Sequence, residues 1–220
     1  MVKIKSVIFD WNGTLVDDVW LSVKVMNKML EKRGKKPITA EYYKSIFSFP
    51  VINYYRELGL DVENEWDLIS KEFIDIYLED AEKLELFQDV VPVIKDFKEK
   101  SLTIGIFSAM EHSLLIKHTE HFKIPPFFDF IQGIEDHYAG GKIHLAQKIL
   151  EKTELEGGEI LFVGDTYHDY EVATEIGCQV VLINRGHNPK EKLKETRVPV
   201  LNSLKELKDF VFQINFGGSK

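Results

Sequence analysis

Cysteine is nearly absent from this sequence: Cys178 is the single example among 220 residues. One cysteine cannot build a disulfide framework or a cysteine-based zinc site within one chain. Cys178 follows Ile176 and Gly177 in a mostly apolar stretch. Because free cysteines are among the most frequently buried residues, we expect a buried structural thiol.

Long apolar runs are missing as well, and none approaches the length that crosses a bilayer. The first residues, 1–5, lead directly into a strand pattern without the apolar core of a signal peptide. We therefore expect a cytoplasmic protein that has no membrane partner.

Positive charge is in short supply: 28 Lys and Arg residues stand against 36 Asp and Glu, giving a formal net charge of -8. A nucleic-acid partner needs clustered Lys and Arg, so this balance argues against one. One local positive cluster still suffices for a small phosphorylated substrate. The 44% hydrophobic and 29% charged content is ordinary for a globular protein of one core domain with or without an insertion.

Five short apolar runs are the strongest signal of secondary structure. Each has the length and the β-rich composition of a strand that is buried on both faces. Helical patterns alternate with the later runs, at about residues 90–100, 111–122, 142–152 and 168–177. This alternation predicts an α/β fold with a parallel sheet. The runs cover residues 7–9, 102–107, 128–131, 160–163 and 180–183.

Residues 16–84 interrupt this alternation and contain no run typical of a buried strand. Apolar residues recur there at helical spacing, which predicts a mostly helical module inserted after the first strand. Most of its aromatic residues are expected to pack in the core, although those near residues 47–50 are candidates to face a substrate. The helical spacing is seen at Val19, Val23, Met26 and Leu30, and again at Trp66, Ile69, Phe73 and Ile76.

Polar residues follow three of the predicted strands at the point where each strand ends. Asp10 follows the first run, Ser108 the second, and Gly164 and Asp165 the fourth. Ligands of parallel α/β sheets bind beyond the carboxyl ends of the strands. Each residue alone is compatible with an ordinary strand end, but together they indicate a site.

The residue types at this edge suit phosphoryl transfer. Asp10 and Asp165 would repel each other unless a cation lay between them. Oxygen ligands without a His or Cys cluster suit magnesium, which also offsets the charge of an incoming phosphate. Gly13 permits a tight turn whose N–H groups can point at the phosphoryl oxygens.

Residues 10–17, Asp-Trp-Asn-Gly-Thr-Leu-Val-Asp, are similar to the first motif of the haloacid dehalogenase (HAD) superfamily. Ser108 resembles the hydroxyl of its second motif, Lys142 the lysine of its third, and residues 164–169 its fourth. The helical insertion resembles the C1 cap of the phosphoglycolate-phosphatase-like branch. The resemblance therefore implies a Rossmann-like three-layer core in residues 1–15 and 85–220, with a helical cap in residues 16–84.

The resemblance also implies a role for each motif residue in a phosphatase. Asp10 attacks phosphorus and becomes an aspartyl-phosphate, while Lys142 neutralises charge on Asp10 and on the phosphoryl oxygens. Asp169 supports the metal through water or orients Lys142. Two simpler interpretations are that Lys142 is a solvated residue at a helix start and Asp169 a favourable charge at a helix N-terminus. The implied magnesium ligands are Asp10, the main-chain carbonyl of Asn12, Asp165 and Asp169, and the implied phosphate-binding residues are Gly13, Ser108, Ala109 and Lys142.

Asn12 departs from the phosphatase pattern, which has a second aspartate at this position. That aspartate protonates the leaving group and then deprotonates the attacking water, and an amide can do neither. General acid–base catalysis contributes about 10²–10⁴-fold, so a slow or specialised phosphatase is expected. We expect Asn12→Asp to raise the rate and Asp10→Asn to abolish activity.

The amide at position 12 is compatible with several hypotheses. One is a replacement acid, for which His168 and His112 are candidates by proximity to the motifs. Another is an engineered substitution that traps an intermediate, and a third is a protein that binds a phosphorylated ligand with little turnover. A phosphonate hydrolase would need a cap lysine, for which the candidates are Lys24, Lys28 and Lys44. Asp165 and Asp169 argue against dehalogenase activity, and Asn12 argues against a sugar phosphomutase.

Overall fold

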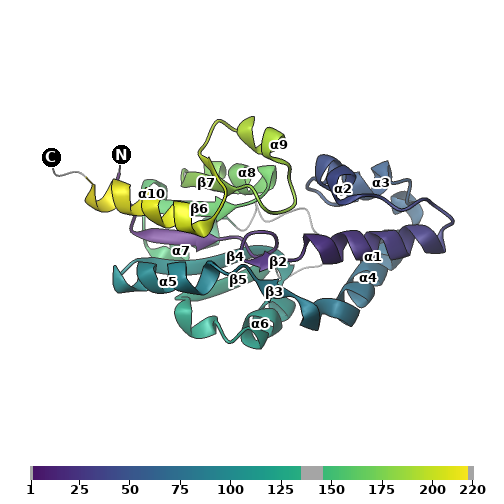
Figure 1. Cartoon of the computed structure of the whole chain (residues 1–220), viewed down its shortest axis with the longest axis horizontal. Helices are drawn as coiled ribbons and strands as arrows, with labels where there is room; N and C mark the ends of the chain where they lie inside the picture. The colour runs from purple at the N-terminus through teal and green to yellow at the C-terminus, as the bar shows by residue number, and fades with distance from the viewer. Residues whose placement is uncertain (1, 135–145, 218–220) are drawn as a thin grey trace.

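A six-stranded parallel sheet forms the centre of the protein (Figure 1). The structure is a computed structural model that describes residues 2–134 and 146–217. Its strand order is β5-β4-β1-β6-β7-β8, so the first strand lies inside the sheet between two later ones. The strands are β1 (Ser6–Phe9), β4 (Thr103–Glu111), β5 (Phe130–Ile134), β6 (Ile160–Gly164), β7 (Gln179–Ile183) and β8 (Val200–Leu201).

Helices cover both faces of this sheet and complete a three-layer core. Val7 and Phe9 point to the face that carries α5 and α10, whereas Ile8 points to the face that carries α7 and α8. The alternation of successive strand side chains explains why all three residues are buried. The helices are α5 (Val90–Glu99), α6 (His112–His121), α7 (Gln147–Thr153), α8 (Tyr167–Glu175), α9 (Lys190–Lys194) and α10 (Leu204–Phe216), with 3₁₀ turns at Pro125–Phe127 and Gly157–Glu159.

The insertion after β1 is helical, as predicted, and lies beyond one end of the sheet (Figure 1). Two of its helices begin at capping side chains: Thr39 accepts a hydrogen bond from Tyr42 N–H, and Asp61 from Asn64 N–H. A two-residue strand, β2, precedes the helices and pairs antiparallel with β3, which follows them. These elements are β2 (Val16–Asp17), α1 (Val19–Lys32), α2 (Ala40–Ile46), α3 (Ile52–Glu57), α4 (Val62–Asp80), the 3₁₀ turn Ala81–Lys83 and β3 (Glu85–Leu86).

The predicted fold class is confirmed, and the differences concern the end of β4 and the short strand β8. The apolar run at 102–107 predicts a strand that ends before Ser108, whereas β4 continues to Glu111 through an irregularity in its pairing with β5. The short strand β8 has no run of its own in the prediction. The predicted start of the helix at residue 142 lies outside the described residues.

Two smaller expectations concern burial and membranes. Cys178 is buried, as predicted, and burial raises the pKa of its thiol to about 12. The longest described helix, α4, has 19 residues. None of the described helices combines the length and the apolar character that crossing a membrane requires.

The central strand gives a direct test of the core. Ile8 has no exposed surface and packs against side chains of the α7 and α8 layer. Ile8→Ala is expected to lower the free energy of unfolding by about 2–5 kcal/mol, because it leaves a cavity in a packed layer. Urea unfolding measures this loss. The control Val2→Ala removes a side chain that is 57% exposed and is expected to change little; equal effects of both variants would contradict the assignment.

Candidate active site

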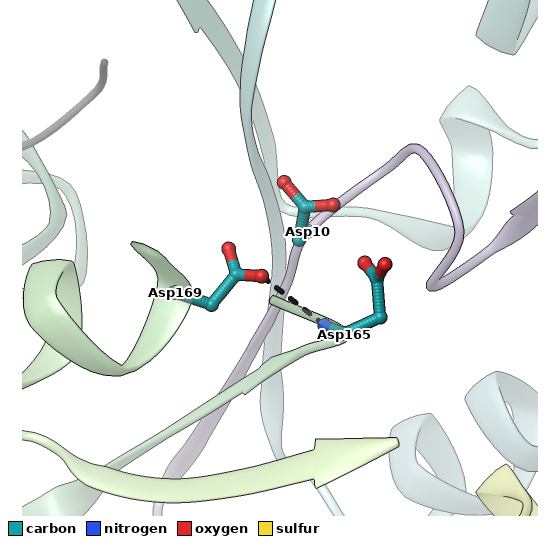
Figure 2. Close-up of side chains that lie close together, drawn as sticks. All are labelled: Asp10, Asp165 and Asp169. Carbon is teal, nitrogen blue, oxygen red and sulfur yellow. Dashed lines mark hydrogen bonds between the residues drawn. The ribbon is translucent and has the colours of Figure 1, made fainter. Parts of the chain in front are cut away.

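Three buried carboxylates meet at the carboxyl end of the sheet (Figure 2). Asp10 follows β1, Asp165 follows β6, and Asp169 lies in the first turn of α8. One oxygen from each lies within 4.8 Å of the others. The adjacent strands align Phe9 with Val163, and Asp10 N–H donates to the Val163 carbonyl at 2.8 Å. The parallel register therefore brings together residues that are 155 positions apart in the chain.

Asp169 also stabilises the start of α8. Its Oδ2 accepts hydrogen bonds from Thr166 N–H at 2.9 Å and from the Thr166 hydroxyl at 2.7 Å, and Asp165 N–H donates to the same oxygen. Thr166 in turn accepts from Asp169 N–H, which completes a capping box. Asp169 therefore has the role at a helix N-terminus that the sequence suggested. The capping box also fixes its carboxylate beside those of Asp10 and Asp165.

Asp165 is held in a fully buried position by its neighbours. It accepts hydrogen bonds from the Thr14 hydroxyl at 2.9 Å and from the main-chain N–H of His187 at 2.6 Å. A Cβ atom at Gly13 would lie 2.5 Å from its Oδ2, and one at Gly186 would be closer still. The chain therefore encloses this carboxylate through two positions that accept no side chain.

The charges of this cluster call for a cation. Burial raises the pKa of Asp165 to about 6; the charge of His187 opposes this shift and the charge of Asp169 adds to it. Buried carboxylates that repel one another are stabilised by a positive ion between them. The donors are oxygens only, which fits a hard divalent ion such as magnesium.

Gly13 permits the tight turn after β1, as predicted. Its positive φ of 72° allows the turn that begins at Trp11. Its N–H donates to the Val16 carbonyl at 3.0 Å and to Asp18 Oδ1 at 2.9 Å. Its role in phosphate binding stays a prediction.

The predicted phosphate-binding residues of β4 lie beside the carboxylates. Ser108 is buried, its Oγ accepts a hydrogen bond from Met110 N–H, and both Ser108 and Ala109 line the same cavity as Asp10. Lys142 lies outside the described residues. Among the described residues, the structure thus brings Asp10, Ser108 and Ala109 together.

Asn12 is held by two neighbours that the sequence did not indicate. Its side-chain N–H₂ donates to Asp18 Oδ2 at 2.7 Å and to the Tyr77 hydroxyl at 3.4 Å, and that hydroxyl donates to the same Asp18 oxygen at 3.3 Å. Both acceptors lie on the same side of the amide nitrogen, because they are only 3.3 Å apart.

Asp18 forms a buried ion pair with His187. The His187 Nε2 lies 3.1 Å from Asp18 Oδ1, and Nδ1 lies 2.9 Å from the Tyr43 hydroxyl. Burial raises the pKa of Asp18, but His187 and the hydrogen bonds from Asn12 and Gly13 outweigh it and hold this pKa below its usual range. Burial lowers the pKa of His187, but Asp18 and the nearby carboxylates raise it to about 9. The pair is therefore charged at neutral pH.

A cavity of about 630 Å³ lies over the carboxylates. Asp10, Asn12 and Ser108 line one end of it, and aromatic side chains of the helical insertion line the other. A site of this size accommodates a small organic molecule. The geometry thus combines a cluster of buried carboxylates, a candidate cation site and a cavity for a ligand.

A family profile described as haloacid dehalogenase-like hydrolase matches residues 7–183. The chain belongs to this family. The match confirms the predicted family and the predicted class of enzyme, a hydrolase, and the phosphatases among its relatives fit the predicted phosphoric monoester hydrolase.

The relatives of this family member include phosphatases of two kinds. A phosphoglycolate phosphatase of Synechococcus elongatus is 24% identical over 195 residues, which cover 86% of this chain and 88% of that one. The pyrophosphatase PpaX of Bacillus mycoides is 21% identical over 83% of this chain and 85% of its own length. The haloacid dehalogenase-like hydrolase SP0104 of Streptococcus pneumoniae superposes with a TM-score of 0.84 at 19% identity, covering 96% of this chain and 99% of that one.

Sequence reasoning missed Asp18 and His187, although a signal for each was present. Asp18 directly follows the first motif of the family, and His187 stands shortly after the end of β7. The strand-end rule inspects the residue directly after each run, here Asn184, so only a search of the longer segment that follows β7 would have found His187. The two histidines proposed from the motifs lie elsewhere: His112 accepts a hydrogen bond from Gly133 N–H, His168 stacks on a phenylalanine ring, and neither is among the described residues that line the cavity.

The ion pair between Asp18 and His187 predicts a specific dependence of stability on pH. His187 has a folded-state pKa of about 9, above its ordinary value of 6.5, so its stabilising contribution is present below pH 6.5 and is lost as the pH rises to 9. His187→Gln should remove this slope. It should also lower the free energy of unfolding at pH 7 by about 3–5 kcal/mol, because it leaves the Asp18 charge buried without a partner.

Urea unfolding between pH 7 and 9, without added divalent ions, measures both effects. The exposed His121 provides the matched control, His121→Gln. An unchanged pH slope in His187→Gln would contradict the charged state of the pair.

Proposed function

We propose that this chain is a magnesium-dependent phosphatase that hydrolyses a small phosphorylated metabolite through an aspartyl-phosphate on Asp10. The observation that carries this proposal is the position of the Asp10 carboxylate: it lines the cavity and lies within 4.8 Å of Asp165 and Asp169. Membership of the hydrolase family and the phosphatase relatives add support.

In the first step, an oxygen of Asp10 attacks phosphorus and the bond from phosphorus to the leaving oxygen breaks. Ser108 and the Ala109 N–H bind the phosphoryl oxygens, and Lys142 neutralises their charge. In the second step, water attacks the aspartyl-phosphate, releases inorganic phosphate and restores the Asp10 carboxylate. Lysine and hydroxyl partners of this kind stabilise charge as it develops on the phosphoryl group.

Magnesium would be held by the Asp10 carboxylate, the main-chain carbonyl of Asn12 and Asp165, with support from Asp169. When bound, it supplies positive charge that lets an anionic nucleophile approach an anionic phosphate. The three carboxylates of this set are buried together, which is the arrangement that such an ion stabilises.

Proton transfer is the weak step of this site. Asn12 carries no transferable proton, and its amide nitrogen donates to Asp18 and Tyr77. Both ring nitrogens of His187 are engaged, Nε2 with Asp18 and Nδ1 with the Tyr43 hydroxyl, so neither is available to a leaving group. We therefore infer a phosphatase that is slow towards esters with poor leaving groups.

The lack of a transferable proton at Asn12 also favours a second candidate, a protein that binds a phosphorylated ligand with little turnover. The phosphonate-hydrolase alternative has less support, because none of the lysines proposed for it is among the described residues that line the cavity. Two of those lysines form ion pairs instead, Lys24 with Asp80 and Lys28 with Glu79.

The division of the chain into two domains is part of this proposal. We propose a catalytic core in residues 1–15 and 85–220 and a cap in residues 16–84. The pairing of β2 with β3 supports these boundaries, because it joins the chain where it leaves the core to the chain where it returns.

Hydrolysis of p-nitrophenyl phosphate tests the proposed activity, since this leaving group needs little protonation. We expect magnesium-dependent release of p-nitrophenol that EDTA abolishes and that Asp10→Asn lowers by at least about 10³-fold, because an amide is a poor nucleophile. The control Asp209→Asn makes the same change at an exposed residue of α10. Equal activity of Asp10→Asn and the control would refute the role of Asp10 as nucleophile. Binding without turnover would favour the protein that binds a phosphorylated ligand.

The contact between Asn12 and Asp18 refines the expectation for Asn12→Asp. A carboxylate at position 12 would stand beside the Asp18 carboxylate, and two such groups do not both ionise readily. We therefore expect the double variant Asn12→Asp with Asp18→Asn to raise kcat for an alkyl phosphate by about 10²-fold. The single Asn12→Asp variant should gain less.

Steady-state kinetics on ethyl phosphate compare the two variants with the single Asp18→Asn control, which has no acid at position 12. A single variant as fast as the double would show that Asp18 does not restrain the introduced acid. No gain in either would contradict the missing-acid argument.

A further inference from the structure

The far end of the cavity is built from aromatic rings. Phe47 follows α2, Tyr54 and Tyr55 lie in α3, and Trp66 and Phe73 lie in α4; all of them line the cavity. Neighbouring rings are in contact, with centroid distances of 5.2 Å from Phe47 to Tyr54 and 4.4 Å from Tyr54 to Tyr55. The wall continues from Tyr55 to Trp66 at 5.7 Å and to Phe73 at 6.1 Å.

This wall is uncharged. Burial raises the pKa of Tyr54 and of Tyr55, so both phenols stay neutral. The hydroxyl groups of two further aromatic lining residues face the network beneath the wall, Tyr43 towards His187 and Tyr77 towards Asp18. A ligand at this end therefore meets mainly ring faces and edges.

The charged residues of this end do not favour a second anionic group on the substrate. Lys71 of α4 lines the cavity, but Asp67 and Asp75 line it too, one helical turn to either side of that lysine. The other described cation of the lining, His187, is paired with Asp18. A carboxylate or a second phosphate would therefore meet more negative than positive charge at this end.

We propose that the cavity selects phosphate monoesters with a bulky, apolar and uncharged leaving group, of about the size of a two-ring aromatic. The inference rests on the proposed phosphatase activity of Asp10. The phosphate would lie against Asp10 and Ser108, and the leaving group would extend along the aromatic wall. A cavity of about 630 Å³ is larger than a phosphorylated two-carbon acid or pyrophosphate requires.

Matched esters of primary alcohols test the size of the leaving group, since their reacting bonds are alike. With magnesium, kcat/KM for 2-(2-naphthyl)ethyl phosphate is expected to exceed that for ethyl phosphate by about 100-fold, because the ring system leaves water for an apolar wall. Equal values for the two esters would overturn the proposal.

Two isosteric pairs test the charge. Phosphocholine is compared with 3,3-dimethylbutyl phosphate, which replaces the quaternary nitrogen by carbon, and phosphoglycolate is compared with isobutyl phosphate, which replaces the carboxylate by an isopropyl group. We expect the neutral member of each pair to have the higher kcat/KM. A higher value for phosphocholine would overturn the proposal and indicate a cationic leaving group held by the rings. A higher value for phosphoglycolate would overturn it and indicate an anionic leaving group.

A substitution in the wall links this preference to the cavity. Ser70 lies in α4 between Trp66 and Phe73 and lines the cavity. Ser70→Trp fills space there and is expected to lower the ratio of kcat/KM between the naphthylethyl and ethyl esters at least tenfold. Leu68→Trp adds the same ring to an exposed position of the helix, 68% exposed, and should leave the ratio unchanged. An unchanged ratio in a folded Ser70→Trp protein, checked by circular dichroism, would overturn the proposal.

A binding measurement separates this proposal from the proposed function. Calorimetric titration, with magnesium, of 3-(2-naphthyl)propylphosphonate and of ethylphosphonate needs no turnover. Tighter binding of the naphthyl compound with no hydrolysis of any ester would support the aromatic site and refute the phosphatase. Hydrolysis of ethyl phosphate together with equal binding of both phosphonates would support the phosphatase and refute the aromatic site.

Discussion

Repulsion among three buried carboxylates is the constraint on which the site depends. Asp10, Asp165 and Asp169 approach one another because strand register and a helix cap fix their backbones. The protein offsets part of the cost with hydrogen bonds to Asp165 and Asp169 and with the charge of His187. The remaining negative charge makes this edge of the sheet a place for a cation, and through a cation for a phosphate.

A second balance of charge surrounds Asn12. The neutral amide of Asn12 donates to Asp18, and Asp18 is paired with His187. The nearby carboxylate is that of Asp18, six residues further along the chain, which lines the same cavity and contacts His187. In the proposed phosphatase, this arrangement would separate the formation of a phosphoenzyme from rapid proton transfer.

The sequence predicts the sheet and the carboxylates well because both follow from local patterns. Buried strands appear as apolar runs, and Asp10, Ser108 and Asp165 appear as the residues that end them. The prediction is weaker where a contact joins distant segments. Asp18 and His187 are 169 positions apart, and the direction of the Gly13 N–H depends on where the Asp18 side chain turns. The strand β8 has only two residues, too few for a periodic pattern.

The pairing of β2 with β3 has an evolutionary consequence. The insertion leaves and rejoins the chain at adjacent paired residues, Val16 with Leu86 and Asp17 with Glu85. Its helices can therefore be exchanged as one unit while the parallel sheet keeps its register. Asp18 stands near the start of that unit, whereas Asn12 stands outside it. A descendant that acquired a new insertion for a new substrate would inherit Asn12 without the residue that restrains it, and its proton chemistry would change along with its specificity.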